Sequence, residues 1–286
     1  MAGIAVVTDS TADLSPEQAA AAGIHVVPLY VRFGTEEHRA GVDLTTPEFW
    51  EHLLAPGAPI PTTSAPSPGD FRTAFKGIFA GGADAIVCPV LGTKLSATFQ
   101  SATLAAQSLP DREIHVIDTH STSMSTGIPA LMAAELVRAG ASAVDVAAAI
   151  ERRLPDIDLY IAVDTLEYLR KGGRLSAAQA VIGTMLSVKP IITVVDGTVT
   201  LLERQRTRSK ARARVVELIA ARPLERLSIL HTPTSTPDEV AAFRETLLAA
   251  IPGGVDADKV TVGLVGASTG PHLGPDLMGA CFLVRA

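Results

Sequence analysis

The sequence predicts an α/β protein of two domains, with a parallel sheet covered by helices on both faces in the first half and a mixed sheet with helices in the second half. Apolar runs of strand length alternate with segments of helix length up to about residue 139, which is typical of parallel βαβ units. In the second half an Asp-Gly pair separates two apolar runs and indicates a hairpin. The chain has 286 residues, a length that favours two domains over one.

The composition limits the classes of function. Hydrophobic residues make up 47% of the chain but aromatic residues only 4%, so we expect an aliphatic core. A net charge of −6 argues against a protein that binds nucleic acid along its whole surface. Cys88 and Cys281 lie in apolar runs and favour buried thiols over a disulfide. Because the sequence shows neither a signal peptide nor an apolar run of membrane length, we expect a cytoplasmic location.

The first half begins with a strand at 4–8 and a helix opened by Ser15 and Pro16 and ended by Gly23. The run at 24–33 predicts a second strand. Further strands are expected at 84–90 and 113–119, and further helices from about 46, 67, 98 and 125.

The second half has a different order of elements. Asp196-Gly197 lies between apolar runs and predicts a hairpin within 189–206. A helix is expected after Ser176, and further elements are a helix at 236–251 and strands at 226–232, 259–265 and 279–286. The predicted domains are residues 1–155 and 156–286, divided at Pro155-Asp156.

Polar side chains follow three strands of the first predicted sheet. Asp9 and Asp13 come after the first strand, Ser96 comes after the strand at 84–90, and Asp118 ends the strand at 113–119. Ligands of open α/β sheets bind beyond the carboxyl ends of strands, so three polar ends together predict a polar ligand site. Turn formation and helix capping explain each segment separately, and that interpretation stays open.

The segment "LGTKLSATFQSA" (91–102) lacks the spacing of a phosphate-binding P-loop. Ser96, Ala97 and Thr98 are expected at the first turn of a helix, where free backbone N–H groups favour an anion. Capping alone would account for the same residues. Upstream, Ser67 with Asp70 predicts a helix cap. It leaves Thr62, Thr63 and Ser64 in an extended loop bounded by prolines, which is either part of a site or only a polar surface loop.

Two basic segments and one histidine complete the candidates. Gly172-Gly173 presents Arg170, Lys171 and Arg174 together, and six cations alternate between Arg204 and Arg214. Such segments are either solvated basic surface or a site for phosphate or an acidic partner. His272 lies between two Gly-Pro pairs, which favours a positioned functional role. The other histidines show no metal-ligand spacing, so no metal site is expected.

Taken in order, these segments resemble the DegV family of bacterial proteins. The matching stretches are "TDSTADLS", "TTSAPSPGDF", "LSATFQSA", "VIDTHSTSMSTG", "TLEYLRKGGRLS", "MLSVKPII" with "ERQRTRSKA", and "GPHLGPD". The resemblance covers almost the whole chain and implies two α/β domains with a ligand cleft between them. It also implies that the chain binds one long-chain fatty acid in an apolar tunnel.

Some members of the family are the FakB subunit of bacterial fatty acid kinase, which presents the fatty acid to an ATP-dependent kinase subunit in phospholipid synthesis. The resemblance therefore implies a lipid-binding carrier without catalytic residues, cofactor or metal. It implies that Thr63, Ser96, the Ala97 backbone and His272 contact the carboxylate, and that Arg174 and Arg206 serve the acyl-phosphate or the kinase. Where many members have Ser-Gly-Thr, this chain has Ser96-Ala97-Thr98, and alanine adds a methyl group and disfavours positive φ.

Two other functions are compatible with parts of the sequence. Ser96 as nucleophile and His272 as base would make an acyl hydrolase or transferase, although no orienting acid or oxyanion motif is recognisable. The basic stretch at 203–214 would suit a nucleic-acid-binding module, against which the acidic net charge and the few aromatic residues argue.

Overall fold

The computed structural model describes residues 3–175 and 188–285. The chain forms two compact units, and each combines segments that are distant in sequence. Unit 1 consists of Met1–Thr45, Pro61–Pro155 and Gly266–Ser268, and unit 2 of Thr46–Ile60, Asp156–Val265 and Thr269–Ala286. The sequence predicts two domains, 1–155 and 156–286, as parts of the chain that fold independently. This prediction is about folding and not about contacts, and it stays a prediction.

Unit 1 contains a four-stranded sheet in which all neighbouring strands are parallel. The strand order is β2-β1-β6-β7, and the strands are β1 (Ile4–Asp9), β2 (Ile24–Val27), β6 (Ala85–Val90) and β7 (Glu113–Asp118). Every residue of β6 is buried, as is typical of a central strand that is covered on both faces. The parallel sheet predicted from the first half of the sequence is confirmed.

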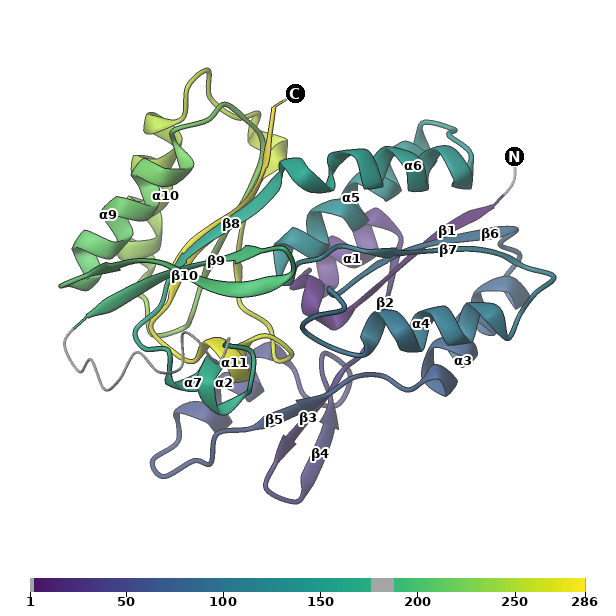
Figure 1. Ribbon diagram of the computed structural model, residues 1–286, viewed down its shortest axis with the longest axis horizontal. Helices are drawn as coiled ribbons and strands as arrows, with labels where there is room; N and C mark the ends of the chain where they lie inside the picture. Colours follow the sequence, from purple (N-terminus) through teal and green to yellow (C-terminus); the bar gives the residue numbers. More distant parts are fainter. Residues whose placement is uncertain (1–2, 176–187, 286) are drawn as a thin grey trace. The chain divides into compact units, whose positions relative to one another are not determined.

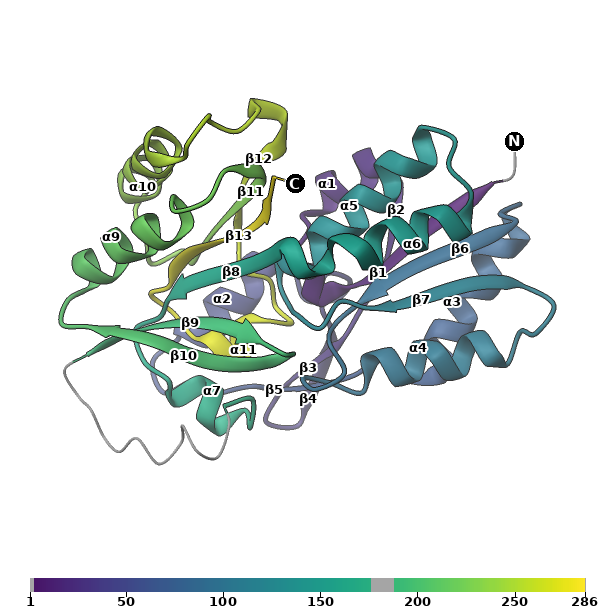
Figure 2. The same ribbon diagram turned by 45° about the horizontal axis from the view of Figure 1, so that its top comes forward.

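Helices cover both faces of this sheet (Figure 1, Figure 2). Val6 and Val87 point to one face and Val7 and Ile86 to the other, because successive side chains of a strand alternate. The first face packs against α5 (Met124–Arg138) and α6 (Ala143–Arg153), with α1 (Pro16–Ala22) beside α5; the second packs against α3 (Pro68–Ala80) and α4 (Thr98–Gln107).

Helix starts in unit 1 follow the predicted capping signals. The Ser15 side chain accepts the N–H of Gln18, the Gln18 side chain accepts the N–H of Ser15, and Gly23 ends α1 with φ 69°. Ser67 and Asp70 form the same reciprocal box at the start of α3. Each box satisfies two N–H groups that have no partner within the helix.

The single strand predicted at 24–33 is wrong. The run is divided into β2 and β3 (Tyr30–Phe33), and these belong to different sheets. Pro28 follows β2 directly and has no N–H with which to continue the ladder, so the chain leaves the parallel sheet there. The small second sheet has the order β4-β3-β5, with β4 (Glu36–Arg39) and β5 (Thr62–Ser64).

Unit 2 is built on a six-stranded mixed sheet of order β10-β9-β8-β13-β11-β12. The β11–β12 pair is parallel, and the other pairs are antiparallel. The predicted hairpin is confirmed, since β9 and β10 meet at Asp196 (φ 48°) and Gly197 (φ 73°), which have the positive φ of a tight hairpin turn. The strands are β8 (Ile157–Ala162), β9 (Lys189–Val195), β10 (Thr198–Gln205), β11 (Leu224–His231), β12 (Val260–Leu264) and β13 (Met278–Val284).

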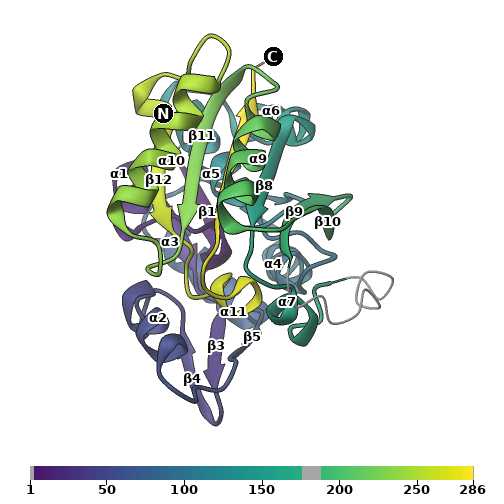
Figure 3. The ribbon, with the colours of Figure 1, turned by 90° about the vertical axis from the view of Figure 1, so that its left-hand side faces the viewer.

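Two helices cover one face of this sheet, α9 (Arg208–Ile219) and α10 (Pro237–Ala250) (Figure 3). Their apolar side chains pack on Ile229, Ala280 and Phe282 of the central strands. Shorter elements are α2 (Thr46–Leu54), α7 (Glu167–Lys171), α11 (Gly270–Leu273) and the 3-10 turns η1 (Ser10–Ala12), η2 (Leu154–Asp156) and η3 (Ala257–Lys259). The helix predicted after Ser176 lies outside the described residues.

Candidate functional site

The carboxyl end of β1 is organised by a fully buried carboxylate. Asp9 is 0% exposed, and its Oδ1 accepts the backbone N–H (2.8 Å) and the hydroxyl (2.5 Å) of Thr11. Its Oδ2 accepts the N–H of Leu91 at 2.7 Å, the first residue after β6. Burial raises the pKa of Asp9, and these hydrogen bonds oppose the shift. Asp9 therefore joins the ends of two adjacent strands and fixes the start of the loop that carries Ser96.

A second carboxylate holds the same loop from the other side. Asp118 ends β7, and its Oδ2 accepts the hydroxyl of Thr93 at 2.6 Å. The N–H of Gly92 also donates to the Ser121 carbonyl, and a Cβ at Gly92 would lie 2.9 Å from the backbone after β7. The loop after β6, residues 91–97, is therefore held between β1 and β7. The polar ligand site expected at these strand ends stays a prediction.

Ser96 lies just before α4 and is partly buried. Its Oγ is 2.9 Å from Thr98 Oγ1 and accepts the Thr98 N–H at 3.3 Å. Ala97 is exposed, and its φ of −76° is readily adopted by any L-residue. Alanine therefore adds a methyl group at this position but causes no backbone strain, contrary to the cost expected for a position that needs positive φ.

Thr63 is the central residue of β5, opposite Val31 of β3. Thr62 and Ser64 are exposed, whereas Thr63 is partly buried on the opposite face of the strand. The three hydroxyls of this segment are therefore not equivalent, since Thr63 lies on the partly buried face of the strand and the other two on the exposed face. The sequence pattern predicts an extended loop here, and the segment is a short strand.

The two polar residues that follow β1 bind another part of unit 1. Asp13 Oδ1 accepts the N–H of Gly266 at 3.0 Å, and Ser10 Oγ lies 2.6 Å from Ser268 Oγ. Asp13 Oδ2 also accepts the hydroxyl of Ser123, whose φ of 58° and ψ of −149° are unfavourable for a residue with a side chain. Asp13 and Ser10 therefore hold the segment Gly266–Ser268 on the first sheet, which is a structural role.

In unit 2, His272 lies against a glycine of the "KGG" segment. A Cβ added to Gly172 would be 2.3 Å from His272 Nδ1, so only glycine leaves room for the imidazole there. The Nδ1 atom is shielded from solvent, although the side chain as a whole is only partly buried. The lack of a side chain at Gly172 therefore allows α7 to pack directly against the histidine.

A second close contact joins the same two segments. A Cβ at Gly274 would lie 2.3 Å from the Tyr168 ring, and Gly274 has a φ of 71°. On the other side of α11, a Cβ at Gly270 would lie 2.4 Å from Phe49 of α2. The glycines that surround His272 therefore allow α11 to pack closely on α7 and α2.

The electrostatics of this region keep His272 neutral. Burial lowers the pKa of His272 to about 4, and the Arg174 guanidinium contributes to the shift. Arg174 is itself partly buried, donates from Nη1 to the Gly172 carbonyl at 2.5 Å, and has a pKa lowered by burial. Near neutral pH the site therefore presents an uncharged imidazole close to a fixed positive charge.

The six alternating cations of the basic stretch do not form one surface. Arg208, Arg212 and Arg214 make ion pairs with acidic side chains of unit 2. Arg204 and Arg206 are exposed and have no ion pair among the described residues. The change from β10 to α9 at Thr207 separates the two groups, because a strand and a helix direct alternate residues differently.

Sequence reasoning did not identify Asp164 and Asp276 as site-supporting residues. Both accept hydrogen bonds from Arg208, at 2.9 Å and 2.7 Å respectively. The only local signal was their place, one after a strand and one after a Gly-Pro pair, and neither position predicts a partner 44 or 68 residues away.

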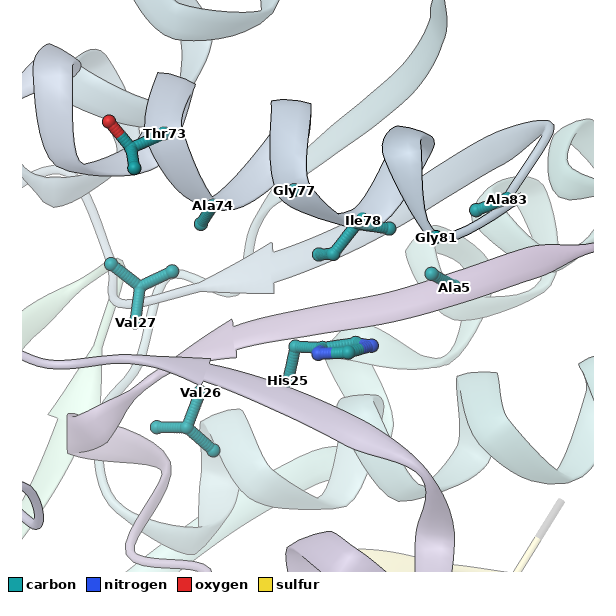
Figure 4. Close-up of a pocket in the computed structure, with 10 residues that line it drawn as sticks. All are labelled: Ala5, His25, Val26, Val27, Thr73, Ala74, Gly77, Ile78, Gly81 and Ala83. Carbon is teal, nitrogen blue, oxygen red and sulfur yellow. The ribbon is translucent and has the colours of Figure 1, made fainter.

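A separate groove of about 520 Å³ lies in unit 1 between α3 and the β1–β2 edge of the sheet (Figure 4). Its walls are mostly small or apolar, and His25 and Thr73 are its polar side chains. Neither Thr63 nor Ser96 lines it. Within residues 3–175 and 188–285, no group of three or more His, Cys, Asp or Glu side chains is arranged to hold a metal ion, and no helix is long and apolar enough to cross a membrane.

Residues 3–285 match the family model described as "Uncharacterised protein, DegV family". A DegV domain-containing protein of Streptomyces coelicolor is 38% identical over 280 residues, which are 96% of each chain. A solved structure from Thermus thermophilus, described as fatty acid binding of a DegV family protein, has a TM-score of 0.88 and 35% identity and covers 99% of this chain and 100% of that chain. The crystal structure of DegV from Bacillus subtilis, described as a fatty acid binding protein, has a TM-score of 0.86 and 33% identity over the full length of both chains.

Proposed function

Because this chain belongs to the DegV family, we propose that it binds one long-chain fatty acid and acts as a carrier rather than as an enzyme. The observation that carries the proposal is the full-length match to two solved relatives that are described as binding fatty acids. The match includes both units, so the segments of either unit that would contact a ligand have counterparts there.

We propose that Thr63 and Ser96 of unit 1 and His272 of unit 2 bind the carboxylate. Ser96 supports this role because its hydroxyl and the first N–H groups of α4 are donors of the kind that replace water around an anion. His272 supports it because a neutral imidazole keeps one N–H to donate. The Ala97 backbone N–H belongs to the same turn, and with φ at −76° the missing glycine is no obstacle.

The binding energy would come from the acyl chain. A fatty acid of about sixteen carbons has roughly fourteen methylenes, and full burial is worth on the order of 11 kcal/mol before the cost of ordering. The interior of this protein is rich in Ala, Val, Leu and Ile, which suits such a ligand. The groove beside α3 lacks the proposed carboxylate residues, so we assign the acyl chain to a different part of the molecule.

We further propose that the protein presents the carboxylate to an ATP-dependent fatty acid kinase subunit. Arg206 supports this, because it is exposed and has no acidic partner among the described residues, so it is available to phosphate or to a partner protein. Arg174 supports it as a partly buried cation near His272. Replacing Arg206 by Met is expected to lower acyl-phosphate formation with the kinase while fatty-acid affinity stays within about twofold.

The direct experiment is organic extraction of the protein purified from a bacterial host, followed by mass spectrometry. We expect a bound fatty acid in near-stoichiometric amount, and uptake of palmitate by delipidated protein. An empty extract together with no uptake of saturated, unsaturated or branched fatty acids would reject the proposal.

The hydrolase alternative receives less support from the geometry. A serine nucleophile needs a general base within hydrogen-bond reach. The Ser96 hydroxyl is hydrogen-bonded to the hydroxyl of Thr98, which is not a base. Turnover of activated acyl esters that disappears in Ser96→Ala would revive this alternative.

A further inference from the structure

Arg208 bridges two carboxylates that are far apart in the sequence of unit 2. Its Nε donates to Asp164 Oδ1 at 2.9 Å, and its Nη2 donates to Asp276 Oδ2 at 2.7 Å. Asp164 also pairs with Lys189. Burial opposes ionisation of Asp164, but Lys189 and Arg208 outweigh it and lower its pKa. Lys189, Asp164, Arg208 and Asp276 are therefore joined in a chain of three ion pairs.

The two acids belong to the two segments that meet at His272. Asp164 lies between β8 and α7, the helix that ends at Gly172. Asp276 follows α11 and ends the turn that carries His272, and its N–H donates to the hydroxyls of Thr232 and Thr234. Arg208 is thus the side chain that connects the base of the α7 segment to the end of the α11 turn.

The contact between these segments allows little adjustment. His272 Nδ1 lies where a Cβ of residue 172 would be, and the Tyr168 ring lies where a Cβ of residue 274 would be. If the segments moved apart, the imidazole would lose its support on Gly172 and would gain water. If they moved closer, the backbone of Gly172 and the ring would clash.

We propose that Arg208 is a positioning residue that fixes His272 by holding the α7 segment and the α11 turn together through Asp164 and Asp276. The consequence for the ligand rests on the proposed role of His272 in carboxylate binding. Arg208 differs in this from the exposed Arg204 and Arg206, although all three belong to one alternating basic stretch.

The test compares Arg208→Met with Arg204→Met, because both remove one guanidinium from the same stretch and Arg204 has no ion pair among the described residues. Exposed ion pairs contribute little to stability, so both variants are expected to fold with similar thermal midpoints. Palmitate affinity should fall about fivefold in Arg208→Met and stay unchanged in Arg204→Met.

The second readout follows the His272 ring without any ligand. In protein labelled at histidine, the ring resonances are assigned by their loss in His272→Gln and followed against pH. Arg208→Met is expected to shift these resonances and to move the ring's titration toward that of a free histidine, whereas Arg204→Met should leave them unchanged. Arg208→Lys can restore the charge but not both hydrogen bonds, so it should restore the signals only in part.

The outcomes separate this inference from the proposed function. If wild type binds no fatty acid, the carrier proposal fails. The ring titration then still tests whether Arg208 positions His272. If wild type binds palmitate and Arg208→Met gives the same affinity and the same His272 resonances as Arg204→Met, the proposed positioning role of Arg208 is wrong. Should Arg208→Met fail to fold, Asp276→Asn removes the same bridge and is expected to give the same two changes.

Discussion

The loop that carries Ser96 and the turn that carries His272 are held in place by different interactions. In unit 1, two carboxylates hold the loop: Asp9 accepts the N–H of Leu91, and Asp118 accepts the hydroxyl of Thr93. In unit 2, glycine contacts and the ion pairs of Arg208 hold the His272 turn. The Asp9 contacts are buried, whereas the Thr93–Asp118 contact and the ion pairs of Arg208 lie near the surface.

This difference teaches how each loop should respond to change. When a buried hydrogen-bond acceptor is replaced by a group that cannot accept, the N–H groups that donated to it are left unsatisfied, and the free energy of unfolding falls. A surface ion pair can be lost at little cost to stability, but the position it controls can shift. We therefore expect loss of the buried Asp9 contacts to affect stability first, and loss of the Arg208 ion pairs to affect ligand binding first.

The largest expected effect is that of Asp9→Asn. Asparagine has the same shape, but its NH2 group would face an N–H or hydroxyl donor where the carboxylate now accepts. We expect the free energy of unfolding to fall by about 2–4 kcal/mol, measured by chemical denaturation.

Asp118→Asn is the matched control for this prediction. The Asp118 side chain is 12% exposed, so water can replace part of what the amide cannot accept. The loss should be nearer 1 kcal/mol. Equal losses in the two variants would show that burial does not distinguish the two carboxylates.

Gly172→Ala tests the close packing at His272. The new methyl group would occupy the position of the imidazole, so the ring must move. We expect palmitate affinity to fall about tenfold with a smaller loss of stability, as calorimetric titration and thermal unfolding would measure. Gly77→Ala in α3 is the control, because its added methyl group meets nothing within 4 Å and should leave affinity unchanged.

The neutral His272 predicts a pH dependence of stability. The pKa is about 4 in the folded protein and 6.5 for an unperturbed histidine, so between these values the unfolded chain binds the proton more readily. The free energy of unfolding should therefore fall as pH decreases from 6.5 to about 4, by at most about 3 kcal/mol from this residue. His272→Gln should lack this component, and identical pH profiles for the two proteins would contradict the assignment.

The smallest expected effect is that of salt. Raising NaCl from about 0.05 to 0.5 M screens exposed ion pairs but hardly affects a buried carboxylate. Amide hydrogen exchange should accelerate about twofold at Asp276, whose turn depends on Arg208, and stay constant at Leu91. Equal acceleration at both amides would show that salt does not distinguish the Arg208 ion pairs from the buried Asp9 contacts.

Local signals predict the elements better than they predict their supports. The caps at Ser15 and Ser67 and the turn at Asp196-Gly197 depend on neighbouring residues, and all three are confirmed. The run at 24–33 wrongly predicts one strand because its apolar pattern continues across Pro28, while the backbone cannot continue the ladder there.

The candidate residues are accessible to sequence reasoning for a similar reason. Polar strand ends of a parallel sheet must lie at one edge, so the order of strands and helices along the chain is enough to group Asp9, Ser96 and Asp118. The partners of Arg208 could not be found, because they are 44 and 68 residues away. The close contact between Gly172 and His272 could not be predicted from the sequence either, because the two residues are 100 positions apart.

The central claim is that the carboxylate of a fatty acid is bound by Ser96 and His272. The most direct measurement is a titration of delipidated protein with palmitate labelled with ¹³C at the carboxyl carbon, followed by NMR. Wild type is predicted to give one bound carboxyl resonance distinct from that of free palmitate, and Ser96→Ala/His272→Gln to bind more weakly with that resonance displaced. A bound resonance that is the same in both proteins, or no bound resonance in wild type, would contradict the account.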